Sequence, residues 1–136
     1  MKKILFICHG NICRSPMAEF VMKDLVQKAN LQDKIYIESA ATSTEELGNG
    51  MHRGTVTKLR QENIPFTNHR ARQITAQDYN NFDYLIGMDQ ENLYYMEKRW
   101  PNDTDHKISL LLEFANLCRD IADPWYTGNF DKTYAD

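Results

Sequence analysis

The sequence has few cysteines, no basic block and no long apolar run, and each absence excludes a class of protein. Its 136 residues hold only Cys8, Cys13 and Cys118, an odd and low number unlike the disulfide framework of a secreted protein. No stretch approaches the roughly 20 apolar residues of a membrane helix. The apolar start ends at Ile7, too early for a secretory signal. We therefore expect a cytoplasmic protein without a membrane segment.

The sequence also lacks a cluster of basic residues and a set of metal ligands. The 16 basic and 19 acidic residues give a net charge of −3 without a basic stripe, which argues against a nucleic-acid partner. Cys8 and Cys13 have four residues between them, and no second ligand pair accompanies them, so neither metal nor cofactor is expected. With 42% apolar residues, the chain is long enough to fold without disulfides, and we expect one domain over residues 1–136.

Apolar runs predict the strands. Residues 4–7, 84–88 and 108–112 are apolar almost throughout, which is typical of parallel strands buried on both faces. Residues 34–38 alternate between polar and apolar side chains, so this strand is expected nearer an edge of the sheet.

Helical patterns lie between these runs. Ser15 as N-cap and Pro16 as first helical residue predict a helix that extends to about Asn30. Further helices are expected over residues 55–63, shortly after Thr75, and from an Asp89 cap to just before Pro101. The alternation predicts an α/β fold with three layers, α/β/α, around a four-stranded, parallel, twisted sheet.

The segment between the first strand and the first helix has the composition of a phosphate-binding loop. Parallel sheets bind ligands beyond the carboxyl ends of their strands, and this loop begins there. Its backbone N–H groups and the following helix N-terminus are suited to a phosphate dianion. The loop consists of Cys8, His9, Gly10, Asn11, Ile12, Cys13, Arg14 and Ser15.

Each distinctive loop residue has a chemical use. Gly10 and Asn11 tolerate the left-handed backbone that turns the amides inward. Arg14 offers a planar fork for two phosphate oxygens. The positive surroundings favour the thiolate of Cys8, a strong nucleophile, and Ser15 is near enough in sequence to donate a hydrogen bond to it.

Residues 8–19 resemble the signature of the low-molecular-weight protein tyrosine phosphatases. Residues 39–44, 69–73 and 123–126 resemble further segments of that family, in the family's order and over nearly the whole chain. The resemblance implies hydrolysis of phosphotyrosine in proteins and of small aryl phosphates, through a phosphocysteine intermediate. It also implies a monomer that releases inorganic phosphate.

The resemblance assigns further residues. Asp123 would be the general acid and, in the second step, the general base. Trp125 and Tyr126 would form one wall of the substrate slot. Glu45 stands on the opposite wall, where the family usually has an aromatic residue, and its charge is expected to disfavour acidic substrates.

Support and redox roles also follow from the resemblance. Asn11, Ser15, Ser39 and His69 would form a network that holds the loop. Cys13 would form a disulfide with an oxidised Cys8 and so protect it from further oxidation. The family also ends in a helix, and the resemblance implies that this helix is missing from the chain.

Three alternatives remain open from the residues. Arsenate reduction would need further relay cysteines, and only Cys118 lies outside the loop. A phosphocysteine carrier domain would have to exclude water, which Arg14 and Asp123 argue against. A silent phosphotyrosine-binding module would not need these residues. Phosphoarginine remains open as a second substrate.

Overall fold

A four-stranded parallel sheet organises the molecule, as the sequence predicts. The computed structural model describes residues 1–103 and 105–112. The strands are β1 (Lys2–Cys8), β2 (Ile35–Ala41), β3 (Tyr84–Gly87) and β4 (Ile108–Leu110). They pair in the order β2-β1-β3-β4, so β2 lies at an edge and β1 is central.

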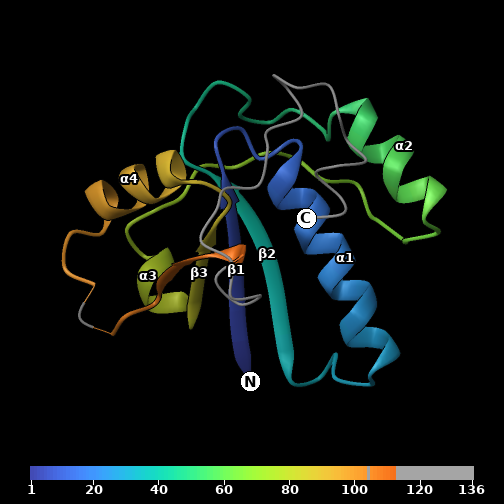
Figure 1. Cartoon of the computed structure of the whole chain (residues 1–136), viewed down its shortest axis with the longest axis horizontal. Helices are drawn as coiled ribbons and strands as arrows, with labels where there is room; N and C mark the ends of the chain where they lie inside the picture. The colour runs from blue at the N-terminus through green and yellow to red at the C-terminus, as the bar shows by residue number, and fades with distance from the viewer. Residues whose placement is uncertain (104, 113–136) are drawn as a thin grey trace.

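Helices cover both faces of the sheet (Figure 1). They are α1 (Arg14–Lys28), α2 (Arg53–Gln61), α3 (Asp78–Asn81) and α4 (Gln90–Arg99). Helix α1 lies on one face with α2 beside it, whereas α3 and α4 lie on the other face. This is the predicted three-layer arrangement. Among the described helices, none is long and apolar enough to span a lipid bilayer.

The apolar run of β1 explains the two cores. Successive side chains of a strand point to opposite faces, so a central strand must be apolar on both. Ile4 and Phe6 pack in the core that includes Val26 of α1. Leu5 and Ile7 pack in the core that includes Met96 of α4.

Several predicted boundaries need correction. Helix α1 begins at Arg14 rather than after Ser15, and Cys13 is its N-cap without a side-chain hydrogen bond. The Ser15 hydroxyl instead serves the loop, as described below. Strand β3 ends at Gly87 and β4 at Leu110, each shorter than its apolar run. Two predictions are confirmed: α1 stops at Ala29 before a left-handed Asn30, and Asp89 caps α4.

One glycine sets the distance between α4 and the sheet. A Cβ atom on Gly87 would lie 3.0 Å from Sδ of Met96 and 3.2 Å from Cβ of Asn92. Helix α4 therefore packs against the end of β3 at a separation that a larger residue would fit only if Met96 and Asn92 shifted. The first residue before that helix, Asp89, reaches the candidate site.

Candidate active site

The loop between β1 and α1 is fixed by backbone bonds to the segment that follows β2. Thr42 N–H donates to the carbonyl oxygen of Cys8 at 2.9 Å, and Ser43 N–H donates to that of His9 at 3.1 Å. On the other side, His52 N–H donates to the Ile12 carbonyl at 2.9 Å. The loop is thus held at both ends at the carboxyl edge of the sheet.

Cys8 ends β1 and its thiol is buried within the loop. Its Sγ lies 3.0 Å from Oγ of Ser15 and accepts the backbone N–H of Asn11 at 3.3 Å. The Asn11 side-chain amide donates to the same Ser15 oxygen at 2.8 Å, so the one hydroxyl hydrogen of Ser15 is available either to Sγ of Cys8 or to the Ala40 carbonyl oxygen, which lies 3.5 Å away. The Asn11 N–H is therefore one donor to the sulfur atom, and the Ser15 hydroxyl is near enough to be a second.

Asn11 uses every polar group that it has. Its φ of 59° confirms the predicted left-handed backbone. Its carbonyl accepts from Nε2 of His69 at 3.0 Å, and its Oδ1 accepts the N–H of Arg72 at 3.2 Å. Because a carbonyl oxygen only accepts, His69 carries a proton on Nε2. Asn11 is fully buried, so these bonds are needed to offset the desolvation of its amide.

The prediction for Gly10 was wrong in its reason. Gly10 does not adopt a left-handed conformation; among the described glycines only Gly48 has a positive φ. Its small size matters instead, because a Cβ atom there would lie 3.3 Å from Cγ of Glu46. Gly10 lets the segment after β2 close over the loop.

Ser39 and His69 meet through a residue that sequence reasoning missed. Ser39 donates its hydroxyl hydrogen to Oε1 of Glu19, and Nδ1 of His69 lies 3.9 Å from the same oxygen. Glu19 is buried and also pairs with Lys23. The available signal was an acidic residue one helical turn after Ser15, on the buried side of α1. Glu19 thus links Ser39, at the end of β2, to the ring that holds Asn11.

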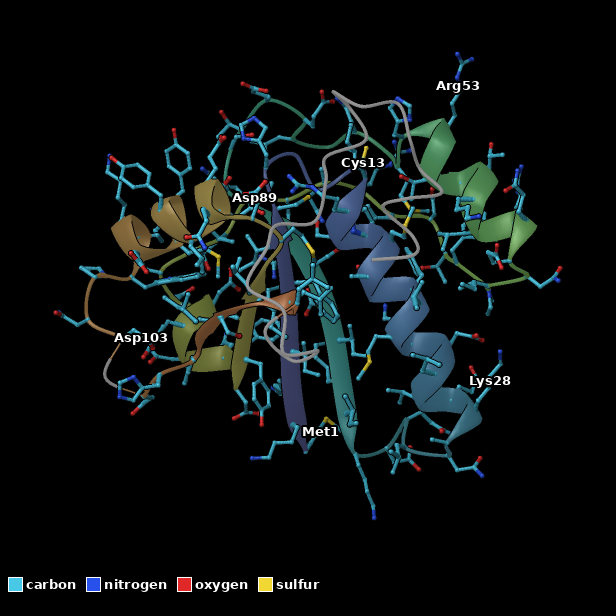
Figure 2. All side chains as sticks on the ribbon, in the orientation of Figure 1. Met1, Cys13, Lys28, Arg53, Asp89 and Asp103 are labelled. Carbon is cyan, nitrogen blue, oxygen red and sulfur yellow. The ribbon has the colours of Figure 1, made fainter. Side chains whose placement is uncertain are left out.

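Asp89 is the second residue that sequence reasoning did not assign to the site. Its Oδ2 accepts from Nη1 of Arg14 at 2.6 Å, while its Oδ1 accepts the N–H of Asn92 at 2.8 Å. One carboxylate therefore caps α4 and orients the loop arginine, whose side chain is only 2% exposed. Asp89 and Cys13, the neighbour of Arg14, both lie at the edge where the strands end (Figure 2). Asp89 follows β3 directly, and that position was the available signal.

The outer rim of the loop carries charged side chains. His9 Nε2 lies 3.1 Å from Oε2 of Glu45, so Glu45 lies beside the loop. This contact does not test the predicted role of Glu45 as a wall of the substrate slot. His9 Nδ1 lies 3.9 Å from Oε1 of Glu91, in the first turn of α4. The His9 ring therefore lies between two acidic residues from different segments of the chain.

Some predicted site residues lie outside the described residues. They are Asp123, Trp125 and Tyr126, together with the third cysteine, Cys118. Cys13 is described, and its thiol, like that of Cys8, is buried and not in a disulfide. Within residues 1–103 and 105–112, no group of three or more His, Cys, Asp or Glu side chains is placed to hold a metal ion.

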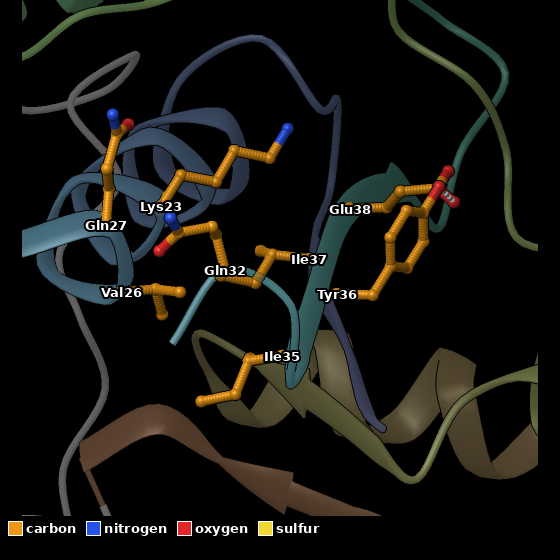
Figure 3. Close-up of a pocket in the computed structure, with 8 residues that line it drawn as sticks. All are labelled: Lys23, Val26, Gln27, Gln32, Ile35, Tyr36, Ile37 and Glu38. Atoms are coloured by element: carbon orange, nitrogen blue, oxygen red, sulfur yellow. Dashed lines mark hydrogen bonds between the residues drawn. The ribbon is translucent and has the colours of Figure 1, made fainter. Parts of the chain in front are cut away.

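Two cavities of the described chain lie away from the loop. One, of about 330 Å³, lies between α1 and the edge of β2 and is lined by Val26, Ile35 and Tyr36 among others (Figure 3). Tyr36 donates its hydroxyl hydrogen to Glu38 there. That hydrogen bond, together with burial, raises the pKa of Tyr36 to about 12. No loop residue lines this cavity, which therefore lies outside the candidate site.

Fold and site together define an α/β protein with a cysteine-containing phosphate loop between its first strand and its first helix. The model of the family described as low molecular weight phosphotyrosine protein phosphatase matches residues 3–136. The chain belongs to this family.

Curated and solved relatives agree with this assignment. The low molecular weight protein-tyrosine-phosphatase YfkJ of Bacillus subtilis is 42% identical over 134 residues, which cover 97% of this chain and 86% of that protein. PtpA of Staphylococcus aureus strain MRSA252, which has the same description, is 40% identical, with 98% and 85% covered.

Solved structures match equally well. The crystal structure of YfkJ superposes with a TM-score of 0.95 at 41% identity, covering 99% of this chain and 86% of that one. The low molecular weight protein tyrosine phosphatase SP-PTP of Streptococcus pyogenes gives a TM-score of 0.88 at 45% identity, with 99% and 85% covered. The protein is a hydrolase of the protein tyrosine phosphatase class, and neither the arsenate reductase nor the carrier alternative is favoured.

Proposed function

We propose that Cys8 is the nucleophile that hydrolyses phosphotyrosine in proteins and small aryl phosphates. The thiolate attacks phosphorus, so that an S–P bond forms while the P–O bond to the phenol breaks. The observation that carries this proposal is the placement of Sγ of Cys8 at 3.3 Å from Asn11 N and 3.0 Å from Ser15 Oγ. These donors favour the thiolate, and they also help it to leave in the second step.

The phosphoryl group binds to the loop from His9 to Ser15 and to Arg14. Its oxygens accept backbone N–H groups and face the positive end of α1, a helix of 15 residues. The Arg14 guanidinium binds two of these oxygens and spreads the charge of the transition state. Its bond to Asp89 supports this role, because it holds a flexible side chain in one orientation.

Asp123 is the proton donor in this proposal, on the strength of the family resemblance of residues 123–126. It protonates the departing phenolate. Its carboxylate then takes a proton from the water that attacks the phosphocysteine, inorganic phosphate leaves, and the Cys8 thiolate is restored.

The remaining assignments follow the same resemblance. Trp125 and Tyr126 form one wall of the slot, and Glu45 lies on the other. Cys13 is the redox partner of Cys8. The protein is a cytoplasmic monomer with a single domain over residues 1–136 and needs no cofactor.

Hydrolysis of p-nitrophenyl phosphate tests the proposal. We expect turnover that vanadate inhibits and that a chelator leaves unchanged. Cys8→Ser is expected to abolish turnover while inorganic phosphate still binds, measured by calorimetry. Cys118→Ser is the matched control outside the loop and is expected to keep activity. Residual turnover in Cys8→Ser, or loss of activity with chelator, would refute the assignment of the nucleophile.

Transfer of a ³²P label from substrate to the enzyme distinguishes a phosphocysteine intermediate from direct attack by water on the substrate. Rapid acid quenching during turnover is expected to trap label on the protein, and Cys8→Ser is expected to trap none. Labelling that persists in Cys8→Ser would show that another residue carries the phosphoryl group.

A further inference from the structure

The phosphate loop has an acidic rim built from two distant segments. Glu45 lies in the segment after β2 and pairs with Nε2 of His9. Glu91 lies in the first turn of α4, and its Oε1 is 3.9 Å from Nδ1 of the same ring. His9 is the second residue of the loop, so both carboxylates are held next to the place where a phosphorylated side chain enters.

The carboxylates of Glu45 and Glu91 remain accessible to a substrate despite their contacts with His9. The side chains of Glu45 and Glu91 are 70% and 65% exposed, and exposed ion pairs contribute little to folding stability. Nδ1 of His9 is buried and has no hydrogen-bond partner within the described residues. One ring therefore faces two carboxylates, and the rim has a net negative charge whichever protonation state His9 adopts.

The neighbouring acidic residues have other partners. Asp89 holds Arg14 and caps α4, and the Glu46 side chain accepts from the amide of Asn49. Among the described acidic side chains next to the loop, Glu45 and Glu91 are thus the two most available to a substrate. The phosphate loop favours a negatively charged group on the ligand, whereas the carboxylates of Glu45 and Glu91 favour a positively charged group next to it.

We propose that Glu45 and Glu91 are specificity-determining residues that select phosphotyrosine followed or preceded by Lys or Arg. This inference rests on the proposed function and names its preferred substrate class. The phosphoryl group fixes the tyrosine ring over Cys8, so the adjacent residues of the peptide must cross the rim. A cationic side chain there meets carboxylates on both sides, and an acidic one is repelled by both.

Charge range supports a preference limited to near neighbours. The Debye length is about 8 Å at physiological ionic strength, so only residues next to the phosphotyrosine feel the rim strongly. His9 contributes as a positioning residue: its bond to Oε2 turns Glu45 toward the loop rather than into solvent.

Three phosphotyrosine peptides that differ only at the positions flanking the tyrosine test the proposal. They carry Lys, Ala or Glu at both positions, and kcat/KM is measured for each at low ionic strength. We expect the Lys peptide to exceed the Glu peptide by about 10-fold, the product of two exposed charge interactions. In the double variant Glu45→Gln and Glu91→Gln the ratio is expected to fall to about 2-fold or less.

Glu97→Gln supplies the matched control. Glu97 is an exposed acidic residue on the same helix as Glu91 but lies in its last turns, away from the loop. Its loss of one negative charge, against two in the double variant and one in Glu91→Gln alone, is expected to leave the Lys-to-Glu ratio as in the wild type. An equal fall in Glu97→Gln would show that overall charge sets the preference, and it would overturn the role of the rim.

The outcomes separate this inference from the proposed function. A wild-type ratio near one, or a ratio unchanged in the double variant, refutes the rim while turnover itself still supports the phosphatase. No turnover of p-nitrophenyl phosphate or of any peptide refutes the proposed function, and the substrate preference with it. Charge reversal by Glu45→Lys and Glu91→Lys is expected to invert the ratio, and failure to do so also counts against the rim.

Discussion

The phosphate loop is held from below and bordered from above in two different ways. Below it, Asn11 and Ser15 are fully buried, and the polar side-chain atoms of both have hydrogen-bond partners. At its rim, Glu45 and Glu91 remain largely exposed, and each contacts only the His9 ring among the contacts described above, at 3.1 and 3.9 Å. A buried polar group costs free energy unless it is satisfied, whereas an exposed ion pair adds little. In the proposed function, the chemistry thus depends on the buried side of the loop, and we infer that substrate selection depends on the exposed side.

Arg14→Lys is expected to have the largest effect on kcat/KM, because it replaces the buried guanidinium of the phosphate loop. Lysine cannot form the bidentate contact with phosphate that arginine forms, and removal of one such donor lowers the rate by about 100- to 1,000-fold. We expect kcat/KM for p-nitrophenyl phosphate to fall toward the upper end of that range. Arg53→Lys is the control, since Arg53 points into solvent from α2 (Figure 2). Activity within a few fold of the wild type in Arg14→Lys would contradict the assigned contact.

Asn11→Ala is expected to come next. Two side-chain bonds are lost, the N–H of Arg72 loses its acceptor, and alanine is less tolerant of a φ of 59°. We expect about 2–4 kcal/mol less free energy of unfolding by urea denaturation and about 100-fold lower kcat.

Asn30→Ala is the matched control for that variant. Asn30 also has a left-handed backbone, with a φ of 58°, but it follows α1 far from the loop. It is expected to lose stability without loss of kcat. Equal kcat losses in the two variants would show that the buried network acts only through stability.

Asp89→Asn is expected to have a smaller effect and a distinctive one. Asparagine still caps α4, so the helix is preserved, but its bond to Arg14 is no longer ionic. We expect kcat to fall about 10-fold while the inhibition constant of inorganic phosphate stays equal or falls, because a negative charge leaves the site. Asp24→Asn, which removes the pair with Lys28 at the far end of α1, is the control. Weaker phosphate inhibition in Asp89→Asn would contradict the orienting role.

An increase in ionic strength is expected to have the smallest effect on activity. It distinguishes the exposed rim, whose charges are screened, from the buried side of the loop. At 1 M ionic strength the Debye length is about 3 Å, so the preference for Lys-flanked peptides is expected to shrink severalfold. Hydrolysis of the Ala-flanked peptide, which depends on the buried side, is expected to change less. A preference that survives high salt would have to come from direct packing rather than from the carboxylates.

The sequence predicts the parts of this structure that depend on neighbouring residues. Apolar runs predict the strands, and Asp89 predicts the start of α4, because strand burial and helix capping are local effects. Cys8 and Arg14 are recognised for the same reason, since one short loop contains both. The left-handed Asn11 also follows from its residue type.

Partners distant in sequence could not be predicted in this way. Arg14 and Asp89 are 75 residues apart, and only the pairing of β1 with β3 brings them together. Ser15 is a good N-cap residue by type, and local reasoning assigned it to that role. The structure uses its hydroxyl for Cys8 and Asn11 instead, because a buried sulfur and a buried amide both need a partner.

The missing side chain of Gly87 links the packing of a helix to the reactive end of the molecule. A methyl group there would press on the side chains of Met96 and Asn92, and any shift of α4 that relieved these contacts would also move the carboxylate that begins this helix relative to the guanidinium that it orients. Gly87→Ala would therefore slow the enzyme without touching any group that meets the phosphate. The close packing at residue 87 thus bears on the orientation of Arg14 through the position of α4.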